Sequence, residues 1–148
     1  MTESHDLLGE ERISKASFNH IESELRLYHE TKHRIMIRRE EILFTHIDTD
    51  TNVGGGKSNL PSDPTYKKVS ALESDIKLKE MQRIAEAIEY VWSGLDDDKK
   101  KLLKLYYWTR PQTLTWEGIA IQLHVTSRTA KRWRNQVIKQ IASFLGWQ

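Results

Sequence analysis

Apolar residues recur every three or four positions along the segment from Phe18 to Leu43. They are Phe18, Ile21, Leu25, Tyr28, Ile35 and Ile42, and Lys32 and Arg39 fill the two remaining positions of this stripe. The spacing predicts one long amphipathic helix with an imperfect heptad repeat. Because two charges in the stripe would weaken a coiled coil, two partners remain open for it: another helix of the same chain, or a second copy in a short dimer contact.

A second periodic segment predicts another long helix, from about residue 66 to residue 92. Its apolar positions are Val69, Leu72, Ile76, Met81, Ile84, Ala85, Ile88 and Val91. Gly94 is expected to end this helix. Asp96 is placed to cap a third helix, with Asp97 and Asp98 in its first turn, where the helix dipole favours negative charge. The buried face of that helix consists of Leu102, Leu103, Leu105, Tyr106 and Trp108, and Pro111 ends the segment.

Gly, Asn, Asp, Ser and Pro dominate residues 48–65, which is the composition of a loop. Helical periodicity on both sides of this loop predicts an all-α fold. We expect four consecutive segments: an N-terminal helical region (1–47), a flexible loop (48–65), a long connecting helix (66–93) and a C-terminal domain (94–148).

The stretch from Thr115 to Ile141 has the layout of a helix-turn-helix. Thr115 is expected to cap a short helix, His124 and Val125 to form a tight turn, and Thr126 to cap a second, longer helix. The inner face of the short helix consists of Ile119, Ala120 and Leu123. In a helix-turn-helix, the second helix lies in the major groove of DNA.

On a helical wheel, this second helix has an apolar face and a cationic face. The apolar face consists of Ala130, Trp133, Val137, Ile141 and Phe144. The cationic face consists of Arg128, Lys131, Arg132, Asn135 and Lys139, with Ser127 and Arg134 at its edges. Arg pairs with guanine, Asn with adenine and Lys mainly with phosphate. The residues expected at base edges are Arg128, Lys131, Arg132 and Asn135. Those expected at the DNA backbone are Thr126, Ser127, Thr129 and Arg134.

Charge is unevenly distributed along the chain. No Asp or Glu follows Glu117, whereas five basic residues do. Since the chain has 23 Lys and Arg and 21 Asp and Glu, residues 1–117 hold 18 basic and 21 acidic side chains, a balance of −3. Such segregation indicates a polyanionic partner for the C-terminal part, most often nucleic acid. We therefore expect double-stranded DNA to bind the cationic face.

The composition excludes several other classes of protein. The chain has 148 residues and no Cys, which rules out a disulfide scaffold and a thiolate metal site. Its first residues lack the features of a secretory signal, and no stretch approaches the roughly 20 apolar residues of a membrane span. A chain of this length is also short for most catalytic folds. We expect a soluble intracellular protein that is not an enzyme, with no membrane contact, no cofactor and no metal.

Three motif matches fail on specific residues. In the stretch from Asp48 to Ser58, a phosphate-binding loop needs Gly where Thr51 stands, and a calcium loop needs Gly where Val53 stands. The segment His29 to His33 formally matches the H-E-x-x-H of zinc proteases, but Lys32 would place a cation beside the metal. We interpret the two segments as a loop and a solvated helix face.

The segment "GLDDDKKKLLKLYYW" and the helix-turn-helix pattern after it resemble region four, the C-terminal DNA-binding domain of sigma factors, over about residues 94–146. The whole chain resembles the RinA family of phage transcriptional activators, which is related to the ArpU-type regulators of Gram-positive prophages. The matching elements are "DTDTNVGG", the helical region ahead of it, "AIEYVW", "YYW" and "TSRTAKRWRNQVIKQIASFLG". In this resemblance "DTDTNVGG" is the family's inter-helix loop.

The resemblance implies a function. It implies activation of late phage genes, typically those for packaging and morphogenesis, by recruitment of host RNA polymerase to a late promoter in the bacterial cytoplasm, in association with the nucleoid. A homodimer is one possible oligomeric state. The alternative is an oligomeric phage DNA-packaging protein of small-terminase type, because such proteins also join a helix-turn-helix to long helices. They usually carry the DNA-binding part first, whereas this chain carries it last.

Overall fold

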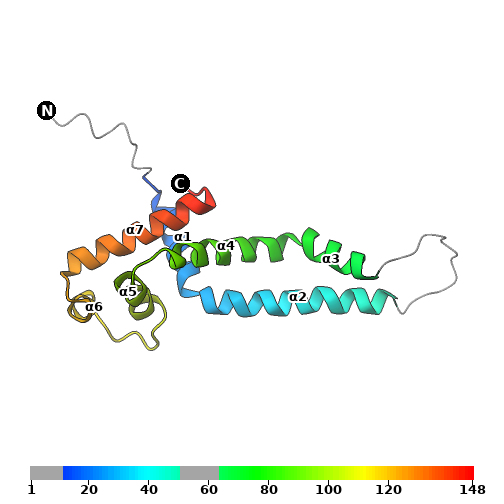
Figure 1. Cartoon of the computed structure of the whole chain (residues 1–148), viewed down its shortest axis with the longest axis horizontal. Helices are drawn as coiled ribbons and strands as arrows, with labels where there is room; N and C mark the ends of the chain where they lie inside the picture. Colours follow the sequence, from blue (N-terminus) through cyan, green and yellow to red (C-terminus); the bar gives the residue numbers. More distant parts are fainter. Residues whose placement is uncertain (1–11, 51–63) are drawn as a thin grey trace. The chain divides into compact units, whose positions relative to one another are not determined.

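The computed structural model describes residues 12–50 and 64–148, and all regular secondary structure in these ranges is α-helical (Figure 1). The all-α expectation is confirmed. The helices are α1 (Lys15–Arg26), α2 (Tyr28–Asp50), α3 (Pro64–Ser74), α4 (Ile76–Ser93), α5 (Asp97–Tyr107), α6 (Trp116–Leu123) and α7 (Ser127–Leu145). Most of the loop expected at residues 48–65 lies outside the described residues; residues 48–50 belong to α2, and residues 64 and 65 begin α3.

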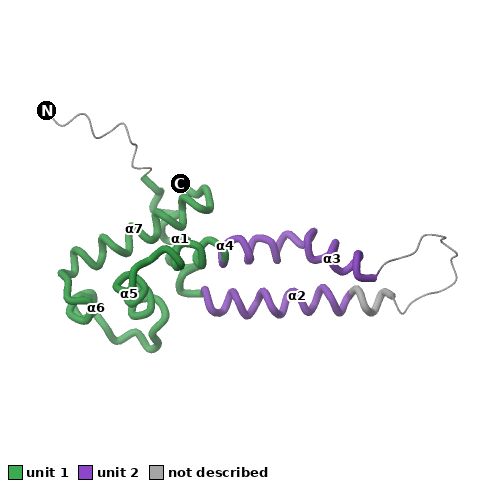
Figure 2. The backbone as a smooth tube through the Cα atoms, in the orientation of Figure 1, with its two compact units in different colours: residues 1–27, 86–148 green, residues 28–85 purple. Residues whose placement is uncertain are grey.

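The chain forms two compact units (Figure 2). Unit 1 consists of Met1–Leu27 and Glu86–Gln148, and unit 2 consists of Tyr28–Ala85. Unit 1 therefore combines segments that are distant in the sequence, because α1 packs on α7. The division into four consecutive segments that the sequence suggests remains a prediction.

Three side chains cap helices in unit 1 where the sequence predicts them. Asp96 accepts a hydrogen bond from the Lys99 N–H at 2.9 Å, and Thr115 accepts one from the Gly118 N–H at 3.1 Å. Thr126 accepts one from the Thr129 N–H at 3.1 Å. Each cap satisfies an N–H group that has no partner within its helix, and so each fixes the first residue of α5, α6 or α7.

One hydrophobic cluster of unit 1 lies where α5, α6 and α7 meet. It contains Leu102, Ile119, Leu123 and Ala130, all of them buried. Half-buried apolar side chains pack around it: Leu105, Tyr106, Leu114, Trp116, Val125 and Trp133. Because Ala130 has only a methyl group, α7 approaches α6 closely at this point. Part of the expected inner face of each helix therefore lies in one cluster: Leu102, Leu105 and Tyr106 of α5, and Ile119 and Leu123 of α6.

The apolar face of α7 departs from its prediction near the C-terminal end. Phe144 was expected on this face, but its side chain is 43% exposed and its ring lies beside Tyr90 with the centroids 5.1 Å apart. The residues buried there are Ile138, Ile141, Ala142 and Leu145. The buried face rotates around the helix because α1 packs on α7 in addition to α5 and α6.

Both long helices predicted from periodicity are interrupted, which corrects the prediction of single helices. The helix expected over Phe18–Leu43 is broken at Leu27, and the helix expected over 66–92 is broken at Asp75. The first break also separates the two units, since unit 2 begins at Tyr28. The apolar spacing continues across Leu27 although the helix does not. The residues before Leu27 pack in unit 1, and those after it pack in unit 2.

Unit 2 has its own small core between α2 and the helices α3 and α4. Its buried members are Ile35, Ile42, Leu78 and Ala85, and its half-buried neighbours are Tyr28, Ala71, Leu72 and Met81. The α2 part of the stripe that begins at Phe18 is thus buried against α3 and α4. Of the two partners that the sequence left open, this part packs on helices of the same chain and not on a second copy. Lys32 and Arg39, the two charged members of the stripe, are exposed.

Asp75 holds the break between α3 and α4. Its carboxylate accepts hydrogen bonds from Arg38 of α2, at 2.6 Å and 3.3 Å, and from the Leu78 N–H at 2.8 Å, so it also caps α4. The Arg38 guanidinium holds the pKa of the Asp75 carboxyl below its ordinary value, and the Leu78 N–H lowers it further. One side chain therefore ends one helix, starts the next and ties both to α2.

Candidate nucleic-acid interface

Helices α6 and α7 are joined by a three-residue turn. His124 adopts a left-handed conformation (φ 56°) at the end of α6, and the Val125 N–H donates to the Ala120 carbonyl at 3.0 Å. This pattern satisfies a carbonyl at the end of α6 and reverses the chain direction. Thr126 then starts α7 at once. The turn holds the first residues of α7 in a fixed position relative to the core beneath them.

Two of the residues expected at the DNA backbone, Thr126 and Thr129, are engaged in the cap of α7. The Thr126 hydroxyl accepts from the Thr129 N–H and donates to the Thr129 hydroxyl at 3.0 Å. Thr126 is exposed, whereas Ser127 and Thr129 are half-buried. The three side chains lie at the N-terminal end of the helix, where the partial positive charge of the helix dipole favours phosphate.

Four members of the cationic face are exposed along one side of α7: Arg128, Lys131, Arg132 and Lys139. The fifth member, Asn135, is half-buried. At about 100° and 1.5 Å per residue, Arg128, Arg132 and Lys139 fall within about 40° of one another along roughly 16 Å of helix. The opposite side of the helix, at Ala130 and Val137, is buried. The structure therefore brings together the charged side chains that the sequence assigned to this face.

Arg134 lies apart from the cationic face. It is half-buried, its guanidinium stands over the rings of Trp116 (4.9 Å) and Phe18 (5.3 Å), and it lies 3.9 Å from the Glu22 carboxylate. Its Nε donates to the Asn135 side-chain oxygen at 2.9 Å. These contacts tie α7 to α1 and α6. The hydrogen bond from Arg134 also orients the Asn135 amide, so that the Asn135 NH₂ group can donate to another acceptor.

A polar cluster between α1, α5 and α7 was not foreseen from the sequence. The Tyr107 hydroxyl donates to the Glu22 carboxylate at 2.8 Å, and Glu22 also faces Arg134 and Arg26. The Trp108 indole N–H donates to the Leu25 carbonyl at 2.7 Å. No local pattern marks these residues, because the partners lie more than 80 positions apart in the sequence. The cluster fixes α1 against the unit that presents α7.

Burial raises the pKa of the Tyr107 phenol well above its ordinary value, and the adjacent Glu22 carboxylate raises it further. The folded state therefore favours the neutral phenol, and this contribution to stability is fully present below about pH 10, the ordinary tyrosine pKa. It is lost as the pH rises above that value towards the pKa of the folded state. Unit 1 should consequently lose stability in alkaline solution.

We expect Tyr107→Phe to lower the free energy of unfolding at pH 7 by about 1–3 kcal/mol, because Glu22 loses a buried donor. Between about pH 9 and pH 11 the variant should lose less stability than the parent chain, since it lacks the titrating phenol. Urea unfolding at several pH values measures both effects. Tyr90→Phe, at an exposed tyrosine of the same unit, is the matched control and should change neither. Equal alkaline losses for the two variants would contradict this account.

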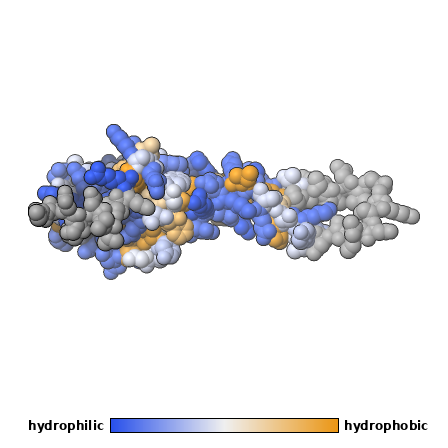
Figure 3. Space-filling model, turned by 90° about the horizontal axis from the view of Figure 1, so that it is seen from above, coloured by the Kyte–Doolittle hydropathy of each residue, from blue (hydrophilic) through white to orange (hydrophobic). Residues whose placement is uncertain are grey.

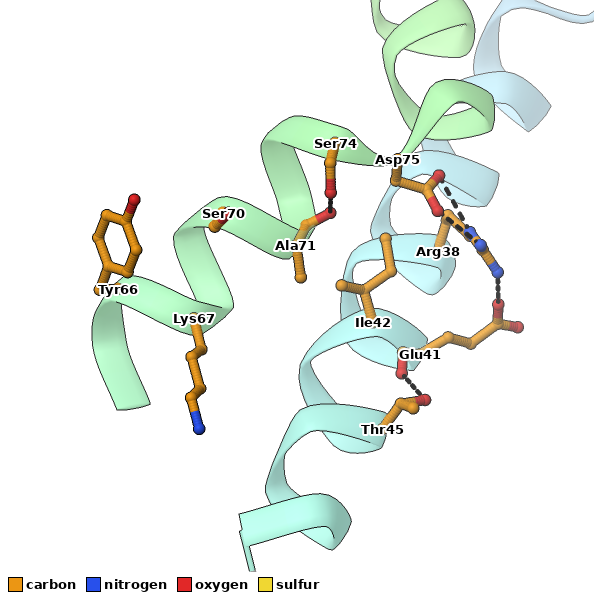
Figure 4. Close-up of a pocket in the computed structure, with 10 residues that line it drawn as sticks. All are labelled: Arg38, Glu41, Ile42, Thr45, Tyr66, Lys67, Ser70, Ala71, Ser74 and Asp75. Atoms are coloured by element: carbon orange, nitrogen blue, oxygen red, sulfur yellow. Dashed lines mark hydrogen bonds and ion pairs between the residues drawn. The ribbon is translucent and has the colours of Figure 1, made fainter. Parts of the chain in front are cut away.

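Unit 2 has a hollow of about 620 Å³ between α2 and α3 (Figure 4). Its polar groups are largely paired with one another: Arg38 with Asp75 and Glu41, the Thr45 hydroxyl with the Glu41 carbonyl, and the Ser74 hydroxyl with the Ala71 carbonyl. This pairing favours a structural role for the hollow.

Residues 12–50 and 64–148 contain no group of three or more His, Asp or Glu side chains arranged to hold a metal ion. These ranges include the H-E-x-x-H match at His29–His33. Within the same ranges, no helix is both long enough and apolar enough to cross a membrane.

Comparisons with known proteins agree with the family resemblance. The sequence model of a family described as "Protein of unknown function (DUF722)" matches residues 20–143. Over 108 residues the chain is 25% identical to the transcriptional activator rinA of Staphylococcus phage phi11, an alignment that covers 73% of this chain and 75% of the relative. No solved structure gives a significant match. The family match spans most of the chain, from α1 into α7, and the chain therefore belongs to the DUF722 family and is RinA-like.

Proposed function

We propose that this chain is a transcription regulator of phage or prophage origin that binds double-stranded DNA through the cationic face of α7. One observation carries the proposal: Arg128, Lys131, Arg132 and Lys139 are exposed together on a helix whose opposite side is buried in the core of unit 1. A rigid helix with basic side chains on its open side matches the shape and charge of a major groove. The similarity to a phage transcriptional activator supports the same function.

In this proposal α6 and α7 act as a helix-turn-helix, with α7 as the recognition helix. Arg128, Arg132 and Asn135 contact base edges. Lys131, which is also expected at base edges from the sequence, is here assigned to phosphate together with Lys139, because an ammonium group pairs mainly with phosphate. The N-terminal end of α7, at Thr126, Ser127 and Thr129, approaches the DNA backbone. Arg134 instead acts as a positioning residue, because its guanidinium is occupied by Phe18, Trp116 and Glu22.

The regulator is proposed to activate late genes, those for packaging and morphogenesis, together with host RNA polymerase. This part of the proposal comes from the RinA-type resemblance and the name of the relative. Two surfaces are candidates for the polymerase contact: the acidic residues of α1 and α2, and the run Lys99–Lys101. Within that run, Lys101 Nζ donates to the Gln122 carbonyl at 3.1 Å, which places it beside the end of α6.

Selection of bound sites from random duplex DNA tests the proposal. The expected result is a defined sequence, and footprinting of that sequence should show protection that extends when host polymerase is added. Failure to retain any duplex, even in dilute buffer, would overturn DNA binding. A large ring of copies that binds DNA without a promoter footprint would instead favour the packaging function of small-terminase type.

DNA affinity should fall steeply with salt. Contact of Lys131 and Lys139 with phosphate releases condensed counterions, so the logarithm of the binding constant should fall with the logarithm of salt concentration with a slope of about −2. Fluorescence anisotropy at several salt concentrations measures the slope. Lys139→Gln should reduce it by about one, whereas the control Gln140→Ala, at an exposed uncharged position of α7, should not change it. A slope that Lys139→Gln leaves unaltered would remove this residue from the interface.

A further inference from the structure

Helix α2 has a second apolar surface, opposite the one buried in unit 2. Met36 is 61% exposed, Ile37 42% and Phe44 65%. Ile37 and Phe44 are seven residues apart and so lie nearly in line on the helix, on the side away from the buried Ile35 and Ile42. On the face drawn in Figure 3, which is not the face of these α2 residues, apolar (orange) residues also lie among hydrophilic (blue) ones. We name this surface the outer stripe; it consists of His33, Met36, Ile37, Glu40 and Phe44.

The charges around Ile37 are arranged symmetrically along α2. His33 and Arg34 precede Ile37 by four and three residues, and Glu40 and Glu41 follow it by three and four. All four side chains are exposed. Arg34 and Glu41 also form ion pairs within the chain, with Glu30 at 2.6 Å and with Arg38 at 3.2 Å. Exposed pairs of this kind contribute little, so they do not prevent a further partner from approaching.

Because basic side chains precede Ile37 and acidic ones follow it, two copies of this helix that run in opposite directions place opposite charges against each other. If a second copy of α2 runs antiparallel, with the two-fold axis near Ile37, then Arg34 of each copy faces Glu41 of its partner on one flank of the contact, and His33 faces Glu40 on the other. A parallel pair would instead set His33 against His33 and Glu40 against Glu40. A surface that fits its own reversed copy is what an isologous two-fold interface requires.

We propose that the outer stripe pairs two copies of this chain through an antiparallel contact between their α2 helices. Met36 and Ile37 form the apolar centre of the contact, and the opposite charges flank it. The contact differs from the stripe of Phe18 to Ile42, whose α2 members are buried within the chain. Since it involves one helix from each copy, it is smaller than the roughly 1,200–2,000 Å² of a stable complex, and the dimer is therefore reversible.

Sedimentation of the full chain over a range of concentrations tests the dimer without DNA, so its result is independent of the proposed function. The expected result is a monomer–dimer equilibrium. Ile37→Glu should raise the dissociation constant at least about tenfold. Ile76→Glu is the matched control, since Ile76 lies in α4 of the same unit and is 83% exposed; it should leave the equilibrium unchanged. Helical content by circular dichroism should be the same for both variants, because both positions face solvent.

Three outcomes of this experiment would overturn the proposal. They are a monomer at every concentration, a dimer that Ile37→Glu leaves intact, and a dimer that Ile76→Glu weakens equally. If the purified chain stays monomeric, the outer stripe would instead be a binding surface for a different protein, such as polymerase.

Cysteine cross-linking tests the direction of the contact, because the chain has no Cys of its own. Ile37→Cys should form a disulfide-linked dimer under mild oxidation, since a disulfide needs Cα atoms within about 7 Å. Phe44→Cys should not, because seven residues on each side of the axis separate the two copies of this position by about 21 Å. Cross-linking of both variants would indicate a parallel pair, and cross-linking of neither would exclude the interface.

Charge reversal tests the pairing across the axis. Glu41→Lys alone should weaken the dimer, because each new ammonium faces Arg34 of the partner copy. Addition of Arg34→Glu to the same chain should restore the affinity. A double variant as weak as the single one would contradict the antiparallel register.

Discussion

Leu102→Ala is expected to lower the free energy of unfolding of unit 1 by about 2–5 kcal/mol. Leu102 is fully buried (0% exposed) and lies against Ile119, Leu123 and Ala130, the residues on which α6 and α7 meet. Removal of its side chain leaves a cavity in a close-packed core that three helices share and that cannot fully collapse. Urea unfolding followed by circular dichroism measures the loss.

Leu105→Ala is the matched control for this variant. It makes the same chemical change on the same helix, but Leu105 is only half-buried, so a smaller loss is expected. DNA affinity at low temperature, where both variants remain folded, should change little. Equal losses of stability for the two variants would contradict this account, because they would show that Leu102 contributes no more to the packing of α6 and α7 than half-buried Leu105 does.

Arg132→Ala and Arg128→Ala should each reduce affinity for the selected DNA site by about 1–3 kcal/mol, with a smaller effect on random duplex. Both guanidinium groups are exposed on α7, and neither has a hydrogen bond or ion pair with the residues that the structure describes. They are thus available to form two parallel hydrogen bonds with a guanine edge. Competition of selected against random duplex, followed by anisotropy, measures the discrimination.

Arg132→Lys separates charge from geometry at this position. It keeps the positive charge but loses the planar fork that pairs with guanine. The salt dependence should therefore stay as in the parent chain, while discrimination between selected and random duplex falls. An equal loss on both duplexes for Arg132→Ala would reassign the residue to a phosphate contact.

Local signals explain which parts of the fold the sequence predicts well. Asp96, Thr115 and Thr126 were identified as caps because a short polar side chain before an apolar-periodic segment acts on an N–H group only three residues away. The all-α class and the exposed position of Arg128 and Arg132 follow from the helical period alone. These features depend on neighbours along the chain, which the sequence displays directly.

The features that the sequence missed depend on partners far along the chain. The break at Asp75 is stabilised by Arg38, which lies 37 residues earlier, although Asp before an apolar run is itself a capping signal that could have located it. The contacts of Arg134 with Phe18 and Glu22 were also not predicted, because they arise only where α1 packs on α7. Phe144 was assigned to the core because the wheel does not show where a third helix will pack.

Unit 2 lies in the sequence between the two parts of unit 1, and this order affects synthesis in the cell. Helix α1 leaves the ribosome before α7, so Ile21 and Leu25, which are buried in the folded protein, have no α7 to cover them at that time. Roughly 120 residues separate the end of α1 from the end of α7, which corresponds to about 6–24 s of translation. During that interval the apolar face of α1 stays without its partner helix, and the proposed DNA-binding surface is completed only after the last part of α7 has emerged.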